Sequence, residues 1–231
     1  MPDPLLLLDT GSPLVSVAVA RGGTVLAQRS VEQQRSSARL LDLVREALEE
    51  AGLKVGDLGG IVGLRGPGSF TGLRIGLATV LGLHQALGVP ATALPTLEVL
   101  AASVDAGEGE AVIAAVDALR GEWSAQAFLG GLIPSALSAM ELAAGADLPR
   151  LAGGRRAAIV GFGVSRLASL PDWAAAPRLV EPGPLAPAAA RLAAGEGVEW
   201  DASFLVSPIY SRPPATSLPR PRAAAPVLRE A

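Results

Sequence analysis

The stretch from residue 58 to residue 90 constrains the fold most, because it combines a short apolar segment, a glycine-rich loop and an apolar helix. The loop reads Arg-Gly-Pro-Gly-Ser-Phe-Thr at positions 65–71, and the pattern after it predicts a helix from Gly72 to Leu87 that Gly88 ends. This helix is apolar on nearly every side and must be covered on nearly every side. Gly72 and Gly76 predict a flat strip where a partner's helix packs, and neighbouring elements of the same chain are the alternative cover.

The first hundred residues read as one α/β unit. Apolar alternation from Leu5 to Val31 predicts three strands joined as a β-meander. An amphipathic helix is expected from Ser36 to Ala51, with a serine as its cap and Gly52 as its stop. We therefore expect three strands, a helix, a further strand, the glycine-rich loop and the apolar helix, in that order.

The second half repeats this theme, since each half opens with a strand that ends in an aspartate, Asp9 and then Asp117. The repeat predicts a duplicated two-lobed α/β fold. The expected later elements are a short helix near 138–143, a strand near 157–160 and an alanine-rich helix near 185–194. We divide the chain into an N-terminal lobe with the partner-binding helices (1–105), a C-terminal lobe (106–211) and a Pro/Arg-rich tail (212–231) with five prolines and four arginines.

The composition excludes several kinds of catalytic and metal site. The chain has no cysteine, which excludes disulfides and zinc–thiolate sites, and its one histidine, His84, excludes any site that needs two. Lys54 is the sole lysine and lies outside any Gly-x-x-x-x-Gly-Lys pattern, so a P-loop nucleotidase is excluded. The opening residues lack the basic and long apolar regions of a signal peptide, so we expect a cytoplasmic protein with no membrane segment.

Two polar turns and the loop are candidates for a nucleotide cleft. Asp9 and Thr10 could hold a metal or a phosphate, as could Asp117 across the cleft. Backbone amides around Gly66, Gly68 and Ser69 could face an anion. Each feature has a plain alternative, a tight turn without a ligand. No third acid or lysine accompanies them, so we interpret the cleft as vestigial and expect no metal.

Several segments resemble the bacterial TsaB (YeaZ) family. They are LLLDTGSPLVSVAV (6–19), SSARLLDLVREALEEAGL (36–53) and LRGPGSFTGLRIGLATVLGLHQALGVP (64–90), with weaker matches at 117–122 and 208–212. The resemblance is close over residues 5–105 and scattered over 110–212. It implies an actin/Hsp70/sugar-kinase fold and a role in forming threonylcarbamoyladenosine beside the anticodon of tRNAs that read ANN codons.

The resemblance implies that this chain is a non-catalytic scaffold that needs no cofactor of its own. Its partners would be the paralogue TsaD, the ATPase TsaE and, for the isolated chain, a second copy, with tRNA reached through the complex and with ATP and metal used by the partner subunits. The expected partner-binding residues lie on the two helices: Leu40, Leu41, Val44, Leu48, Leu73, Gly76, Leu77, Val80, Leu83, His84 and Leu87.

The chain departs from the family where members commonly begin the first helix with a histidine, since Ser36 and Ser37 stand there. This departure removes a metal ligand and favours the scaffold. The alternative is a stand-alone ATP-dependent phosphotransferase or hydrolase of the same fold, which would use Asp9, Asp117 and the loop. Direct RNA binding would rest on the tail arginines and on Arg65, Arg74, Arg155 and Arg156, against a net charge of −3.

Overall fold

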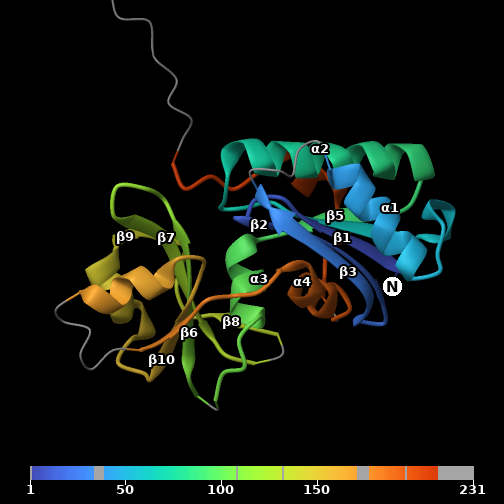
Figure 1. The fold of residues 1–231 in the computed structure, drawn as a ribbon. Helices are drawn as coiled ribbons and strands as arrows, with labels where there is room; N and C mark the ends of the chain where they lie inside the picture. Colours follow the sequence, from blue (N-terminus) through green and yellow to red (C-terminus); the bar gives the residue numbers. More distant parts are fainter. Residues whose placement is uncertain are drawn as a thin grey trace, which may run out of the picture.

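Two β-sheets with helices between and around them form the molecule in a computed structural model, which describes residues 2–33, 39–107, 109–131, 133–170, 177–195 and 197–212 (Figure 1). Among these residues, no helix combines the length and the apolarity that a bilayer span requires. The predicted tail beyond residue 212 and the predicted serine caps at 36 and 37 lie outside the described residues.

The first sheet has five strands in the order β3-β2-β1-β4-β5. Strands β1, β2 and β3 are antiparallel neighbours, so the predicted meander is confirmed, and β4 and β5 add in parallel. The bounds are β1 Leu5–Asp9, β2 Leu14–Arg21, β3 Thr24–Glu32, β4 Gly60–Leu64 and β5 Ala91–Leu94.

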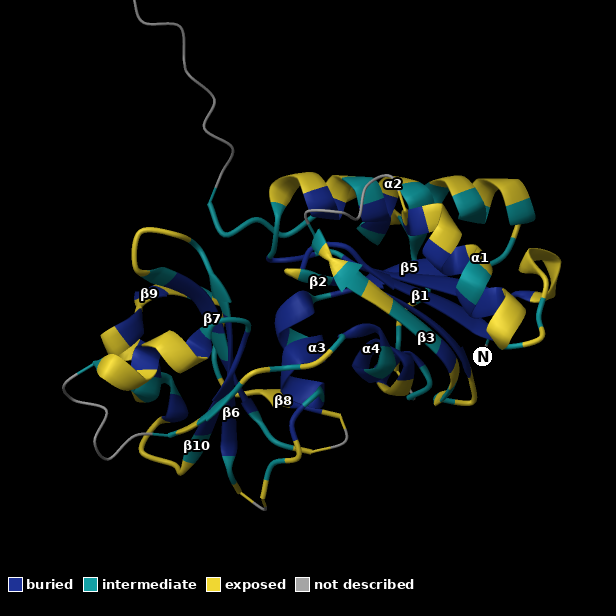
Figure 2. Ribbon diagram, viewed as in Figure 1, coloured by how far each residue is buried: buried dark blue, intermediate teal, exposed yellow. Residues whose placement is uncertain are grey.

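Both faces of this sheet are covered, which explains the unbroken leucines of β1. Leu5 and Leu7 enter the core shared with α3 (Thr96–Ala102) and α4 (Ala186–Ala193). Leu6 and Leu8 enter the core beneath α1 (Leu40–Glu50) and α2 (Phe70–Leu87). Alternate strand residues point to opposite faces, so a strand between two helical layers is apolar at every position (Figure 2).

Both predicted helices of the first lobe are present, with glycines at their ends as expected. Gly52 and Gly88 each take a left-handed φ of +68° after α1 and α2. Helix α2 begins at Phe70, two residues before the predicted start, because the Ser69 hydroxyl accepts the Gly72 N–H at 3.2 Å.

The second sheet has the order β11-β10-β6-β7-β8, and β9 pairs with the other end of the β7 edge that β8 occupies. Short 3₁₀ segments, η3 (Gly145–Ala152) and η4 (Val164–Ser169), cover its outer face. The strands are β6 Ala111–Asp117, β7 Glu122–Leu129, β8 Ser135–Ala136, β9 Glu141–Ala144, β10 Ala157–Val160 and β11 Arg178–Val180.

The helix predicted near 138–143 is wrong, because this segment continues the sheet. Residues 141–144 form β9, which pairs antiparallel with β7. The Ser138 hydroxyl accepts the Ala127 N–H at 3.1 Å, and its carbonyl accepts from Gln126 Nε2 at 2.9 Å. These bonds to β7 replace the local bonds that a helical turn would have made.

The chain returns to the first sheet after it has completed the second. Helix α4 packs on β1 and β2, and the Ala186 N–H donates to the buried Ser16 hydroxyl at 3.1 Å. The segment η6 (Ala202–Val206) packs on β5 and α2. The division of the chain at residues 105 and 211 remains a prediction. Helix α4 and η6 come after residue 106 in the sequence but pack on the first sheet.

Candidate functional site

A cavity of about 520 Å³ lies where the ends of the two sheets meet. Apolar side chains form most of its wall, and the polar ones come from the β1–β2 turn, the glycine-rich loop and the end of β6. Its lining residues include Gly11, Ser12, Gln33, Gly68, Ser69, Phe70, Thr96, Leu100, Asp117, Leu119, Phe162 and Arg212. Of the predicted cleft residues, Gly68, Ser69 and Asp117 line this cavity, whereas Asp9, Thr10 and Gly66 do not.

Asp9 is fully buried at the end of β1, and its carboxylate holds the following turn. Oδ1 accepts the backbone N–H groups of Gly11 at 3.0 Å and Ser12 at 3.2 Å, whereas Oδ2 has no partner among the described residues. Burial raises the pKa of Asp9 to about 6, although hydrogen bonds from Ser12 and Gly11 oppose the rise. Asp9 does not line the cavity, so its role in this structure is to shape the turn.

Thr10 and the helix glycines interlock. The Thr10 hydroxyl donates to the Gly72 carbonyl at 2.8 Å, and Gln33 Nε2 donates to the Thr10 carbonyl at 3.0 Å. A Cβ on Gly72 would overlap the Thr10 carbonyl, and a Cβ on Gly76 would overlap the Thr10 hydroxyl. The predicted strip for a partner helix is therefore corrected: the two glycines admit the chain's own turn.

The glycine-rich loop also binds within the chain. Gly66 takes a φ of +102° and lies against the Ile209 carbonyl, with no room for a side chain. The Ser69 N–H donates to the Gly11 carbonyl at 2.8 Å, and a Cβ on Gly68 would lie 2.7 Å from the same oxygen. The loop thus joins the β1–β2 turn to the start of α2 and uses its glycines for close packing.

Asp117 ends β6 as predicted, and its carboxylate is also engaged. Oδ1 accepts the Leu119 N–H at 2.7 Å, and Oδ2 pairs with Arg166 Nη2 at 2.8 Å. Arg166 and Phe162 were missed from the sequence because they lie some fifty residues farther along the chain. The described residues contain no cluster of three or more acidic or histidine side chains suited to a metal ion.

A C-terminal strap, residues 208–212, closes one side of the cavity. The Ile209 N–H donates to the Arg65 carbonyl at 2.6 Å, and Tyr210 Oη accepts from Arg74 Nε at 3.3 Å. Arg212 then pairs with Glu122 at the start of β7. The strap thereby links α2 of the first lobe to the β6–β7 hairpin of the second, and the sequence signalled it only through its resemblance motif.

Most of the predicted partner-binding residues cover the chain's own sheet. Six leucines and valines (Leu40, Val44, Leu48, Leu73, Leu77 and Val80) are buried in the described core, and Gly76 faces Thr10. Their side chains are not available to a partner in this structure, because the first sheet takes them. Leu41 is 64% exposed, and Leu83, His84 and Leu87 are half-buried, so the accessible set is smaller than predicted.

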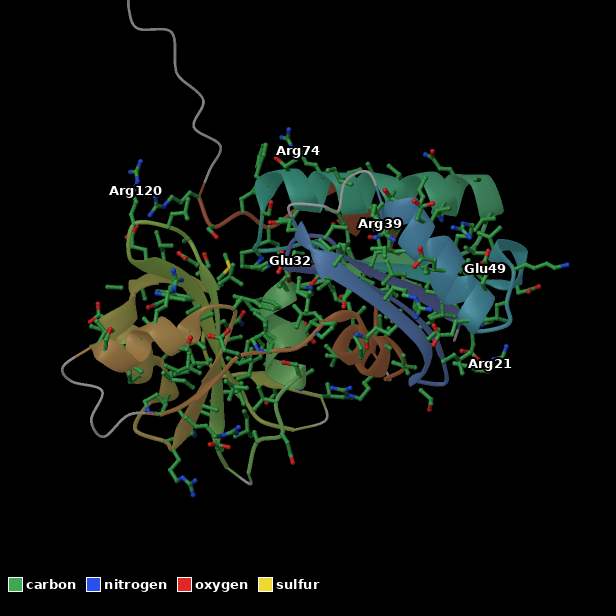
Figure 3. All side chains as sticks on the ribbon, in the orientation of Figure 1. Arg21, Glu32, Arg39, Glu49, Arg74 and Arg120 are labelled. Atoms are coloured by element: carbon green, nitrogen blue, oxygen red, sulfur yellow. The ribbon has the colours of Figure 1, made fainter. Side chains whose placement is uncertain are left out.

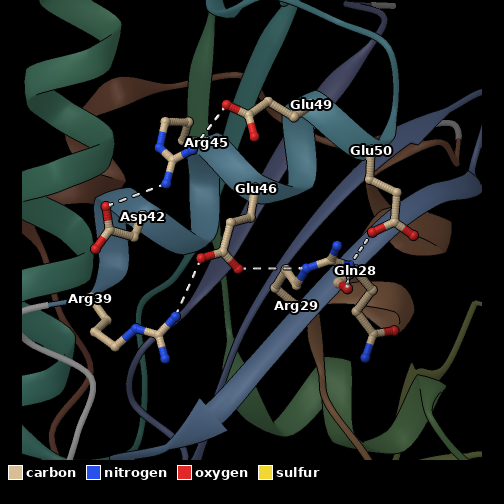
Figure 4. Close-up of polar contacts among 8 residues, drawn as sticks. All are labelled: Gln28, Arg29, Arg39, Asp42, Arg45, Glu46, Glu49 and Glu50. Atoms are coloured by element: carbon tan, nitrogen blue, oxygen red, sulfur yellow. Dashed lines mark hydrogen bonds and ion pairs between the residues drawn. The ribbon is translucent and has the colours of Figure 1, made fainter.

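The outer face of α1 is charged. Arg29 of β3 pairs with Glu46 at 3.7 Å and with Glu50 (Figure 4). Arg39 and Arg45 extend the network to Glu46 at 3.3 Å and to Glu49 at 3.0 Å. Exposed ion pairs of this kind each contribute about 0.2–1 kcal/mol to the free energy of unfolding, so they stabilise the fold only slightly.

Residues 24–138 match the family described as TsaD, tRNA N6-adenosine threonylcarbamoyltransferase. The tRNA threonylcarbamoyladenosine biosynthesis protein TsaB of Escherichia coli is 34% identical over 119 residues, which cover 51% of this chain and 52% of that protein. The chain thus spans about half the length of the curated relatives it matches.

Solved structures extend the likeness to most of the chain. YeaZ from Pseudomonas aeruginosa is 30% identical with a TM-score of 0.70, over 90% of this chain and 99% of that one. The activator of the 2-hydroxyisocaproyl-CoA dehydratase from Clostridium difficile, with bound ADPNP, is 12% identical with a TM-score of 0.50 and covers 84% and 94%. These likenesses confirm the predicted two-lobed actin/Hsp70/sugar-kinase fold.

Proposed function

This chain belongs to the TsaB (YeaZ) family, and on that premise we propose that it is a non-catalytic scaffold in the assembly that forms threonylcarbamoyladenosine in tRNA. It binds the paralogue TsaD, together with the ATPase TsaE, in the cytoplasm, and the isolated chain binds a second copy. The assembly acts next to the anticodon of tRNAs that read ANN codons, and the partner subunits use the ATP and the metal.

The observation that carries the non-catalytic role is the engagement of both cleft aspartates. Asp9 is buried away from the cavity and holds a turn, and Asp117 is paired with Arg166. An ATP-dependent enzyme needs carboxylates free to bind a metal that neutralises the phosphates. Here both oxygens of Asp117 are engaged, and Asp9 is fully buried with Oδ1 bound to the turn, so neither carboxylate is presented to the cavity as a free metal ligand.

The proposed partner surface is what remains exposed of the helix pair. Helices α1 and α2 lie on the same face of the first sheet (Figure 1). Leu41 of α1 projects to solvent, and Ala78 and Gly82 form a low, exposed row on α2 beside the half-buried Leu83. Small residues let another helix approach closely, and the neighbouring leucines supply apolar area.

The double variant Leu41→Glu/Ala78→Glu tests this surface. We expect it to stay folded, because both positions are exposed, and to lose self-association and TsaD binding by at least about tenfold, because two charges would be desolvated. Light scattering measures mass, titration calorimetry measures TsaD affinity and circular dichroism checks the fold. Ile133→Glu, at a position 59% exposed in the second lobe, is the matched control and should bind like wild type. Equal binding by wild type and the double variant would place the interface elsewhere.

The alternative enzyme is tested by ATP turnover of the isolated chain. We expect no turnover near 1 s⁻¹, the lower end of ordinary enzyme rates, with Mg²⁺ or Mn²⁺ present. The measurement is phosphate release from ATP, with the Asp117→Ala variant as the comparison. Metal-dependent release at that rate, abolished in Asp117→Ala, would favour the phosphotransferase or hydrolase over the scaffold.

A further inference from the structure

One end of the molecule gathers arginines and aromatic rings around the mouth of the inter-lobe cavity. We call this surface the arginine rim and define it by Phe70, Arg74, Leu119, Arg120, Tyr210 and Arg212. Phe70, Leu119 and Arg212 all line the cavity, so α2, the β6–β7 hairpin and the strap meet there. Figure 3 shows Arg74 and Arg120 projecting from these two elements on the same side of the molecule.

The aromatic part of the arginine rim is a stack of planar groups. The Phe70 ring, in a residue that is 42% exposed, lies 5.0 Å from the Tyr210 ring, and the Arg74 guanidinium lies 3.9 Å from the Phe70 centroid. The Tyr210 hydroxyl accepts from Arg74 Nε and fixes that side chain. Phe70 is exposed and Tyr210 is half-buried, and an accessible aromatic ring beside a fixed guanidinium is a surface on which nucleobases stack.

Charge at the arginine rim is positive, although the chain as a whole is negative. Two acids next to the rim in the β6–β7 hairpin are each paired with an arginine, Glu122 with Arg212 and Asp117 with Arg166. Within the described part of the chain, neither Arg74 nor Arg120 has an ion-pair partner, so two positive charges remain in excess. Arg74 lies near the N-terminus of the 18-residue helix α2, whose dipole adds to the positive potential there.

The β6–β7 hairpin presents its tip at a conformational cost. Leu119 and Arg120 have φ of +67° and +59°, a region that costs non-glycine residues about 1–2 kcal/mol each. Leu119 is nevertheless 71% exposed, so burial of its side chain does not offset this cost. Non-glycine residues held in this way concentrate at binding sites.

We propose that the arginine rim binds RNA directly, with Arg74 and Arg120 on backbone phosphates and the Phe70–Tyr210 pair against bases. This inference rests on the proposed role in a tRNA-modifying assembly, which supplies the RNA. An acidic protein segment would satisfy the arginines but would offer no planar faces to the rings, so the aromatic stack favours RNA.

The test measures the affinity of the full chain for a fluorescein-labelled anticodon stem–loop RNA by anisotropy at several salt concentrations. Wild type should bind with an affinity that falls as salt rises. Arg74→Glu/Arg120→Glu should bind at least about tenfold more weakly, with the slope of log K against log salt smaller by about 1.5, since two phosphate contacts are lost. Arg155→Glu/Arg156→Glu makes the same charge change at exposed positions in the second lobe, away from the cavity lining, and should stay within about twofold of wild type.

Three results would overturn the proposal: no RNA binding by wild type, an equal loss in both double variants, or displacement of the RNA by polyglutamate at equal charge concentration. The last would assign the arginine rim to an acidic protein. Circular dichroism checks that each variant is folded. The double variant Arg74→Gln/Arg120→Gln removes the two charges without reversing them, and it replaces the glutamate variant if that one does not fold. The single variant Arg120→Glu, on the hairpin and outside α2, separates this test from the scaffold proposal, because it should weaken RNA binding and leave TsaD binding unchanged.

Discussion

Gly76→Ala is expected to lower the free energy of unfolding by about 3 kcal/mol, which corresponds to a fall in Tm of about 6–12 °C. The new Cβ would overlap the Thr10 hydroxyl and lie 3.1 Å from the Thr10 Cβ. Relief requires Thr10 to turn away from the Gly72 carbonyl or α2 to lift from the sheet, and either movement breaks a buried hydrogen bond.

Gly82→Ala, in the same helix, is the matched control. Nothing lies within 4 Å of a Cβ at this position, so alanine should raise stability by about 0.5–1 kcal/mol through helix propensity alone. Thermal unfolding followed by circular dichroism compares the two. If Gly76→Ala melts like wild type and instead loses only TsaD binding, the glycine serves a partner and the packing explanation is wrong.

Asp9→Asn is expected to be more stable than wild type at neutral pH, and the difference should grow as pH rises from 4 to 6. The folded pKa of Asp9, about 6, exceeds the unfolded value of 3.8, so the native state binds the extra proton in that interval. Wild-type stability contributed by this group is therefore present below pH 4 and lost as pH rises through 6, by up to about 3 kcal/mol.

Asparagine keeps the oxygen that accepts the Gly11 and Ser12 N–H groups and carries no charge to desolvate. Urea unfolding of both proteins at several pH values measures the difference, in which the titrations of other groups cancel. Asp9→Ala removes the acceptor and should be less stable than Asp9→Asn at every pH. A difference between Asp9→Asn and wild type that does not change with pH would contradict a raised pKa.

The sequence by itself determined the elements whose signals are local. Alternation predicted the meander of β1, β2 and β3, and glycines placed the ends of α1 and α2. The family motifs predicted the two-lobed fold. Such features depend on residues a few positions apart, so hydrophobic periodicity and helix-capping residues identify them in the sequence. The prediction of a short helix near 138–143 was wrong, because pairing of β9 with β7 outweighed the weak helical propensity of this segment.

Only the tertiary structure decided what the candidate site residues contact. Thr10 bonds to Gly72 sixty-two positions away, Arg212 pairs with Glu122 across ninety, and Arg74 bonds to Tyr210 across one hundred and thirty-six. Sequence reasoning identified Asp9, Asp117 and the glycines as special, but a carboxylate that binds a metal and one that holds a turn have the same local sequence. The difference lies in which donor comes within hydrogen-bond distance, and folding brings that donor from a distant part of the chain.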